Sequence, residues 1–144
     1  MGTRGWQRSC TSSVAMARDV RNLEVFRESD RLLLEVVAIV ATLNSPARFT
    51  FRDQLIRAAL SVPLNLVEGS QRSTTREYGR FVEIAAGSAA ETKYLLSVVG
   101  RMAEEDIRLR RIEQDYEALV RRLQTLRSKL AVLSASGRDR APAP

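Results

Sequence analysis

The side chains best suited to chemistry in this sequence are cations near its C-terminal end. No acidic residue occurs between Glu117 and Asp139. The same interval holds five basic residues: Arg121, Arg122, Arg127, Lys129 and Arg138. On a helical wheel Arg121, Arg122 and Lys129 lie within about 100° of one another, beside the leucine positions rather than on them. Because this stretch lacks acids, these three cations are expected to be unpaired and to form a sequence-independent contact with nucleic-acid phosphates. The alternative is a solvated cationic face at a helix C-terminus. No aromatic side chain interleaves with them, so base stacking is not indicated.

A second set of polar residues lies on two helices that are expected to face each other. Its members are Asn65, Glu68, Arg72, Glu77, Arg80, Ser88 and Glu91. Such a set can form a binding site at the end of a bundle, or a satisfied network that fixes the register of two helices. We favour the network, in which Arg80 is expected to hold Asn65 and Glu77. Glu68 is a third expected partner of this arginine.

The residue types present do not favour catalysis or metal binding. The sequence contains no histidine and one cysteine, Cys10, so it lacks the commonest general base and cannot form an intramolecular disulfide or a thiolate metal site. Glu104, Glu105 and Asp106 form an acidic cluster, which could serve acid–base chemistry if the pKa values of its carboxyl groups were driven apart. Because the cluster falls at an expected helix start, we interpret it as complementing the helix dipole. We therefore predict no enzyme, no cofactor and no metal site.

Length favours one domain, and the net charge is compatible with a polyanionic partner, an inference that the distribution of the charge weakens. The chain has 144 residues, a net charge of +6 and a pI near 10.4, although half of that charge lies in the terminal tails. No apolar run approaches the ~20 residues needed to span a bilayer, so a cytoplasmic location is the default expectation. Residues 1–15 carry arginine and serine without acid, which also fits a transit segment or an extension before a start at Met16. We expect a tail at 1–19, a bundle at 20–134 and a second tail at 135–144.

Apolar periodicity predicts the first two of four amphipathic helices. The first spans 23–43 and ends before Pro46, because proline disfavours the helical conformation of the residue that precedes it. The second begins near Phe51 and is capped by Gly69. Pro63 lies inside this helix and predicts a kink about one turn before it rather than a break. The buried face of the second helix is expected to be Leu55, Ala59, Val62 and Leu66.

The third helix is expected to open at Thr74, whose hydroxyl accepts from the backbone of Glu77 in a capping box. Its seam follows steps of four and three: Tyr78, Val82, Ala85, Ala89, Thr92, Leu96 and Val99. The small residues from Ala85 to Ala90 predict a close helix contact with a crowded neighbour at Gly87. The fourth helix, 105–133, carries the longest stripe: Leu109, Ile112, Tyr116, Leu119, Leu123, Leu126, Leu130 and Leu133. Since no strand pattern occurs, the predicted fold is all-α, an antiparallel up-down-up-down four-helix bundle.

The second and third helices also carry a spaced sequence pattern. S-V-P-x-N-L-V-E-G runs from Ser61 to Gly69. It is followed by Arg72, Glu77-Tyr78, Arg80-Phe81, Ile84-Ala85, Gly87-Ser88 and Glu91, and it is preceded in the first helix by Asn22-Leu23-Glu24-Val25. Together these resemble the four-helix-bundle proteins encoded in intervening sequences of bacterial 23S ribosomal RNA genes, over residues 20–133. The sequence departs from the commonest pattern of that family at Leu64 and Val67, which bears on local helix packing.

The resemblance implies a bacterial protein without established enzymatic activity that forms a ring-like homopentamer. It also implies a more distant relation to the accessory proteins of diversity-generating retroelements, which are basic pentameric bundles that bind a reverse transcriptase and nucleic acid. We call the expected phosphate-binding residues Arg121, Arg122, Arg127 and Lys129 the basic edge. In a pentamer, five copies of the basic edge would form a ring of charge. We therefore expect a homo-oligomeric binding protein that engages ribosomal or other structured RNA, or a nucleoprotein partner, through its arginines. The alternatives are a structural protein–protein scaffold and a retroelement accessory protein.

Overall fold

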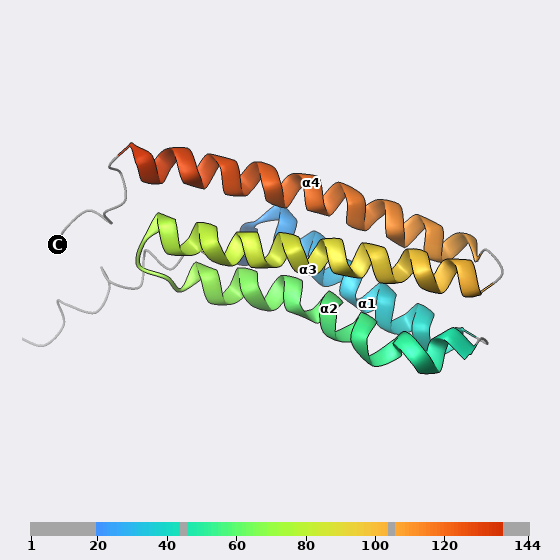
Figure 1. Cartoon of the computed structure of the whole chain (residues 1–144). Coiled ribbons are helices and arrows are strands. Elements are labelled where there is room, and N and C mark those ends of the chain that lie inside the picture. Colours follow the sequence, from blue (N-terminus) through green and yellow to red (C-terminus); the bar gives the residue numbers. More distant parts are fainter. Residues whose placement is uncertain (1–19, 44–45, 104–105, 137–144) are drawn as a thin grey trace, which may run out of the picture.

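The fold is a bundle of four long helices. The structure, a computed structural model, describes residues 20–43, 46–103 and 106–136. After a short 3-10 turn at Val20–Asn22, the helices are α1 (Glu24–Thr42), α2 (Pro46–Ser70), α3 (Thr75–Met102) and α4 (Ile107–Ala135) (Figure 1). The described ranges contain no strand, so the predicted all-α four-helix bundle is confirmed. The tails expected at 1–19 and 135–144 lie outside the described residues, except that Ala135 ends α4 and Ser136 is its C-cap.

Each helix packs against its neighbours in the sequence, and α4 also packs against α1. In Figure 1 each helix ends at the end of the bundle where the next one begins, so consecutive helices run in opposite directions. The contacts of α3 with α2 and α4 are far more extensive than those of α1 with its neighbours. Short connections of this kind place consecutive helices side by side. The backbone of α3 therefore approaches those of α2 and α4 more closely than α1 approaches its neighbours, while α1 still buries Leu32, Val36, Ile39 and Val40 in the shared core.

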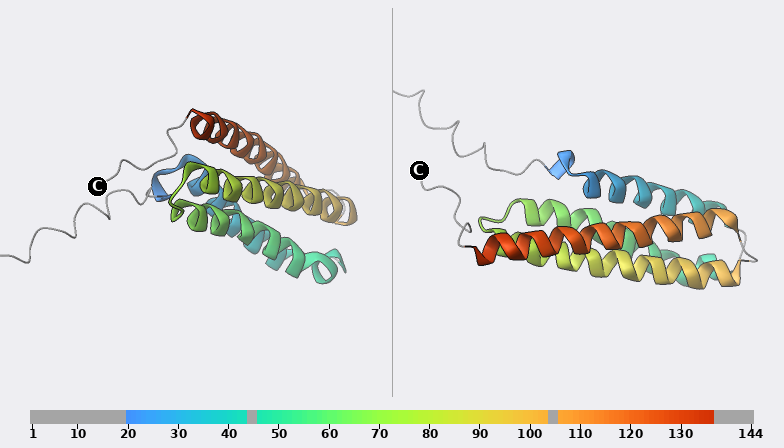
Figure 2. Two further views of the ribbon diagram at one scale, coloured as in Figure 1. Left: turned by 60° about the vertical axis from the view of Figure 1, so that its left-hand side comes forward. Right: turned by 90° about the horizontal axis from the view of Figure 1, so that it is seen from above.

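The predicted seams of α2 and α3 form the core. All four residues expected on the buried face of α2 and all seven on the seam of α3 are buried. The stripe of α4 is also buried from Leu109 to Leu123, and Leu126 is partly buried. Leu133 differs from the prediction, because its side chain is 42% exposed. The physical reason is that α4 extends past the start of α1, so its last turns lack a helix on that side (Figure 2).

Two of the helices begin differently from the sequence prediction. α2 begins at Pro46 rather than near Phe51, because proline is well suited to the first turn of a helix, where its missing N–H is not needed. α4 begins at Ile107, after Asp106 as the N-cap. The start of α3 is as expected: the Thr74 side chain accepts from the Glu77 backbone N–H at 3.1 Å. The hydroxyl of Thr74 also lies 3.1 Å from the Glu77 carboxylate, to which it donates.

Gly69 and Gly87 both differ from the sequence prediction: the close helix contact lies at Gly69, not at Gly87. α2 continues without a break through Pro63 and past Gly69 to Ser70, so Gly69 is not a helix cap. A Cβ atom on Gly69 would lie 2.7 Å from the Cβ of Phe81, which means that α2 and α3 approach closely at this point. A Cβ atom on Gly87 would meet nothing within 4 Å, so the predicted crowded neighbour is wrong. Gly87 lies on the exposed side of α3, away from the buried alanines of the small-residue patch.

Within the described ranges, no helix combines the length and apolarity required to cross a bilayer.

Candidate nucleic-acid interface

The predicted basic edge lies on the exposed surface of α4, but most of its cations are paired. Arg121 Nη1 lies 3.1 Å from Glu117 Oε1 in the same helix. Arg127 Nη2 lies 3.0 Å from Glu83 Oε1 on α3. Arg122 contacts two carboxylates of α1, and only Lys129 has no ion pair with any described residue. The expectation that Arg121, Arg122 and Lys129 are unpaired is therefore wrong for the two arginines.

The partners of Arg122 belong to a row of ion pairs between α1 and α4, which we call the charged seam. Its members are Glu24, Glu28, Arg31 and Glu35 on α1, and Arg111, Asp115 and Arg122 on α4. Arg111 Nη2 lies 2.6 Å from Glu35 Oε2. Arg31 hydrogen-bonds to Glu35 within α1, and its Nη2 lies 3.5 Å from Asp115 Oδ2 on α4. Sequence reasoning missed this seam; the spacing of Glu24, Glu28, Arg31 and Glu35 in steps of four and three was the available signal.

The charged seam aligns two helices more than it stabilises them. Exposed ion pairs contribute roughly 0.2–1 kcal/mol each, because water already solvates the separate charges. Partial burial lowers the pKa of Arg31, but hydrogen bonds and charge from Glu35 and Asp115 outweigh it and hold the pKa above its ordinary value. Arg31 therefore stays charged at physiological pH. The seam is therefore an electrostatic contact that salt or another anion can weaken.

Behind the seam lies a buried hydroxyl without a hydrogen-bond partner. Tyr116 is fully buried, and its Oη has no partner among the described residues. Burial raises the pKa of this hydroxyl well above its ordinary value, while Arg31 lowers it and Glu35 raises it by smaller amounts. Tyr116 is therefore neutral in the folded protein at physiological pH, and it acts as a core residue.

The predicted polar network separates into local groups. In the first, Asn65 Nδ2 donates to Ser61 Oγ at 3.0 Å, and the hydroxyl oxygens of Ser61 and Ser88 lie 2.8 Å apart. This chain of hydrogen bonds links α2 to α3 at mid-height. Ser61 is a member that sequence reasoning missed, although it lies one helical turn from Asn65. Glu91 contributes a separate link, since it accepts from Gln54 Nε2 at 2.6 Å.

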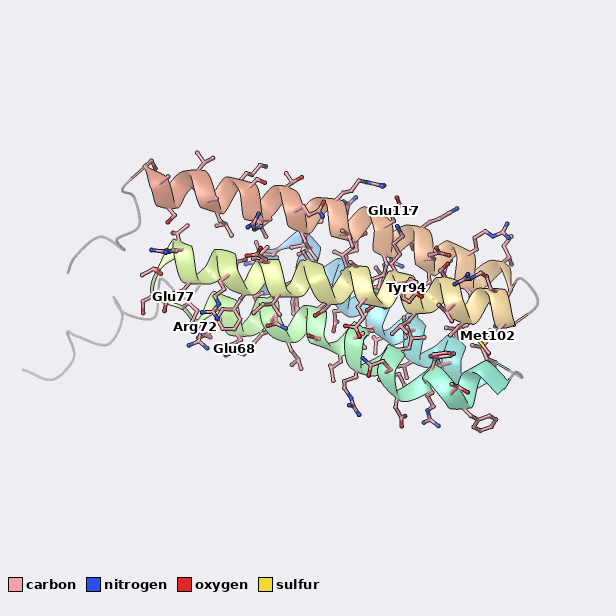
Figure 3. All side chains as sticks on the ribbon, in the orientation of Figure 1. Glu68, Arg72, Glu77, Tyr94, Met102 and Glu117 are labelled. Atoms are coloured by element: carbon pink, nitrogen blue, oxygen red, sulfur yellow. The ribbon has the colours of Figure 1, made fainter. Side chains whose placement is uncertain are left out.

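The other groups lie where α2 turns into α3. Arg72 forms an ion pair with Glu68, and its guanidinium carbon lies 4.7 Å from the centroid of the Phe81 ring. Figure 3 shows Glu68, Arg72 and Glu77 together at this end of the bundle. Glu77 serves the cap of α3 with Thr74. These contacts are local and exposed, so they position the turn.

Arg80 does not hold the network together. Its side chain is exposed, and no hydrogen bond or ion pair joins it to Asn65, Glu68 or Glu77. The predicted bridging role is therefore wrong. The physical reason is rotational: Tyr78 and Val82 face the core, so the residue midway between them points outward. Arg80 is an exposed cation of α3.

A stripe of exposed apolar residues runs along α2. Leu60, Leu64 and Val67 follow steps of four and three and are 41%, 55% and 39% exposed. On α3, Ile84 is also exposed. We call the first three residues the α2 stripe. Leu64 and Val67 are the positions that depart from the family pattern, and their exposure means that they do not disturb packing inside the bundle.

Asp106, the described member of the acidic cluster, caps the N-terminus of α4. Asp106 Oδ1 accepts from the Arg108 backbone N–H at 2.9 Å and thereby caps the helix. A side-chain hydrogen bond from Arg108, and then the backbone bond, lower the pKa of Asp106. Glu104 and Glu105 lie outside the described residues. Across the described ranges, no group of three or more acidic, histidine or cysteine side chains is placed to hold a metal ion.

By its fold and its surface, this protein is a four-helix bundle with charged residues along the edges of its helices. A family model described as 23S rRNA-intervening sequence protein matches residues 21–131, which is most of the chain. The protein belongs to that family, as the resemblance of the second and third helices indicated. A search of curated proteins found no match.

Proposed function

We propose that this protein is a non-enzymatic, homo-oligomeric binding protein that contacts structured RNA through the basic edge of α4. The supporting observation is the stretch of α4 after Glu117, which carries Arg121, Arg122, Arg127 and Lys129 on its exposed surface and no acid. Phosphate oxygens accept strong, charge-assisted hydrogen bonds from arginine. Because the carboxylate partners of these arginines form exposed pairs of low stability, phosphate can replace them.

Self-association is the second part of the proposal, and the α2 stripe is its surface. Exposed leucine and valine side chains at steps of three and four favour packing against another helix. Charges of both signs without an ion pair to any described residue lie on α2, which carries the stripe, and on the neighbouring α1: Asp53 and Arg57 on α2, and Arg27 and Asp30 on α1. A surface with both signs of charge can complement a second copy of itself. We therefore propose that a second copy of this chain packs against the α2 stripe. The expected assembly is the pentamer implied by the family.

RNA binding is tested by fluorescence anisotropy with a labelled RNA hairpin at several salt concentrations. Arg121→Gln with Lys129→Gln removes two cations that hold no other helix, whereas Arg122→Glu would place a carboxylate against Glu24 and Glu28. The double variant should bind several-fold more weakly, and the slope of log affinity against log salt should fall by roughly 1.4–1.8. Arg80→Gln with Arg101→Gln is the matched control, because it removes the same charge from α3.

Two results would overturn the RNA-binding proposal. The first is that the wild-type protein binds no RNA hairpin at low salt. The second is that both double variants lose affinity equally, which would show that net charge alone matters. If the wild type binds no RNA but still self-associates, a protein–protein scaffold becomes the better function.

Self-association is tested by light scattering. Leu64→Glu places a charge in the α2 stripe and should lower the measured mass toward that of a single chain. Val132→Glu, at an exposed position of α4, is the control and should leave the mass unchanged. A wild-type protein with the mass of one chain would contradict this part of the proposal.

A further inference from the structure

We infer that Glu24 and Glu28 of α1 compete with RNA phosphate for Arg122, so that RNA binding at this residue and attachment of the first turns of α1 to α4 exclude each other. The inference rests on the proposed RNA binding and describes how that binding is attenuated. Arg122 Nη1 lies 3.2 Å from Glu24 Oε1 and also donates to Glu28 Oε2. One nitrogen thus serves two carboxylates in the place where a phosphate would bind.

The two glutamates lie in the first two turns of α1, which follow the 3-10 turn at Val20–Asn22. α1 begins at Glu24, and its N-cap residue Leu23 makes no side-chain capping hydrogen bond. Glu24, in the first turn, also interacts favourably with the helix dipole, and the two carboxylates together place negative charge beside Arg122. Glu24 is well exposed, whereas Glu28 is largely covered. A polyanion can therefore displace Glu24 directly, while displacement of Glu28 requires the turn to move.

Lys129 is the residue at which RNA binding can start. It follows Arg122 by two helical turns, so both side chains lie on the same side of α4. Figure 2 shows that α4 extends past the start of α1, which explains why no carboxylate of α1 reaches Lys129. Phosphates can bind first at this uncovered lysine. The adjacent phosphates then compete with Glu24 and Glu28 for Arg122.

The expected size of the competition is moderate. The pair with Glu24 is exposed and therefore weak, and Glu28, although largely covered, pairs with the same half-exposed guanidinium. The two pairs together correspond to about a fivefold change in binding. The carboxylates therefore attenuate RNA binding and do not prevent it. The same reasoning predicts that bound RNA loosens the first turns of α1, because their ion pairs to α4 are lost.

The test is a binding cycle with the full chain and a labelled RNA hairpin. Glu24→Gln with Glu28→Gln should strengthen binding about fivefold at low ionic strength. Glu91→Gln with Glu113→Gln raises the net charge equally away from Arg122, and it should have a clearly smaller effect. In an Arg122→Gln background, the gain from the Glu24 and Glu28 substitutions should disappear, because the shared partner is absent. Circular dichroism checks that each variant remains helical.

Hydrogen exchange supplies a second measurement. RNA should increase amide exchange in the first turns of α1 in the wild-type protein, and exchange there should already be raised in the Glu24→Gln, Glu28→Gln variant without RNA. If the wild type binds RNA, but this variant binds no more tightly than the Glu91, Glu113 control, the competition is overturned and the proposed function stands. If neither the wild type nor any variant binds RNA, the proposed function is overturned and the competition with it. Binding by the glutamate variant alone would contradict the moderate attenuation, and because the wild type would then bind no RNA, it would overturn the proposed function of the wild-type protein as well.

Discussion

The hydroxyl oxygens of Ser61 on α2 and Ser88 on α3 lie 2.8 Å apart, at the centre of a continuous chain of hydrogen bonds. Asn65 Nδ2 donates to Ser61 Oγ at 3.0 Å, and Ser88 Oγ donates to the carbonyl oxygen of Ile84 at 3.0 Å. Since the proton of Ser88 is used in that bond, Ser61 is the donor between the two serines. The chain fixes the level of α2 relative to α3.

Replacement of Ser88 should therefore weaken the contact between α2 and α3. Ser88→Ala leaves the Ser61 hydroxyl without its acceptor and should lower the free energy of unfolding by about 1 kcal/mol. Ser128→Ala is the control, because that serine is exposed and bonds only to its own helix. The measurement is urea unfolding followed by circular dichroism. Equal stability of the two variants would mean that the serine contact does not join the helices.

Two glycines form a matched pair for a packing test. Gly69→Ala places a methyl group 2.7 Å from the Cβ of Phe81 and 3.0 Å from Cδ2 of Tyr78, and it should destabilise the protein by about 1–3 kcal/mol. Gly87→Ala meets nothing within 4 Å and should stabilise it by roughly 0.5–1 kcal/mol through helix propensity. Thermal unfolding of both variants gives the comparison. Loss of stability at Gly87 would indicate that an intermolecular contact covers this position.

Tyr116 should make stability sensitive to alkaline pH. Burial raises the pKa of its hydroxyl, with smaller opposing effects from Arg31 and Glu35. The unfolded chain loses this proton near pH 10 while the folded protein keeps it, so stability falls as pH rises above about 10. Tyr116→Phe removes a buried hydroxyl without a partner and should reduce that fall with little change at neutral pH. Urea unfolding at neutral and alkaline pH tests this, with the exposed Tyr94→Phe as the control; an equal fall in both variants would contradict it.

Asp106 should contribute to the loss of stability in acid. Arg108 lowers the pKa of this carboxyl through a side-chain and a backbone hydrogen bond, so the contribution is present above about pH 4 and is lost as pH falls through the lower folded value. Asp106→Ala removes the N-cap and should cost about 1 kcal/mol at neutral pH. Asp106→Asn keeps a capping oxygen without the titrating group, so its unfolding free energy should depend less on pH in acid. An unchanged acid dependence in Asp106→Asn would exclude Asp106 as its source.

Much of the fold could be predicted because helices report their buried face through local spacing. The seam of α3 from Tyr78 to Val99 repeats in steps of three and four, and every member is buried. The Thr74 cap was equally predictable, since the capping hydroxyl and the N–H of Glu77 are three residues apart. Such features depend on neighbours within one or two helical turns. The family was recognisable for the same reason, because its pattern is concentrated between Ser61 and Glu91.

The partners across helices could not be predicted in this way. Periodicity identifies which side of a helix is buried, but it does not give the level or the rotation of the helix beside it. The level and rotation of each helix are decided by packing in the core. They bring Glu24 and Glu28 into ion pairs with Arg122. They also bring Phe81 close to Gly69 and leave Gly87 without a neighbour. The sequence by itself determined four helices, their core seams and the family. Only the tertiary structure decided the partners of Arg122 and Arg127 on the basic edge, because their carboxylates lie on α1 and α3, close in space and far apart in the chain.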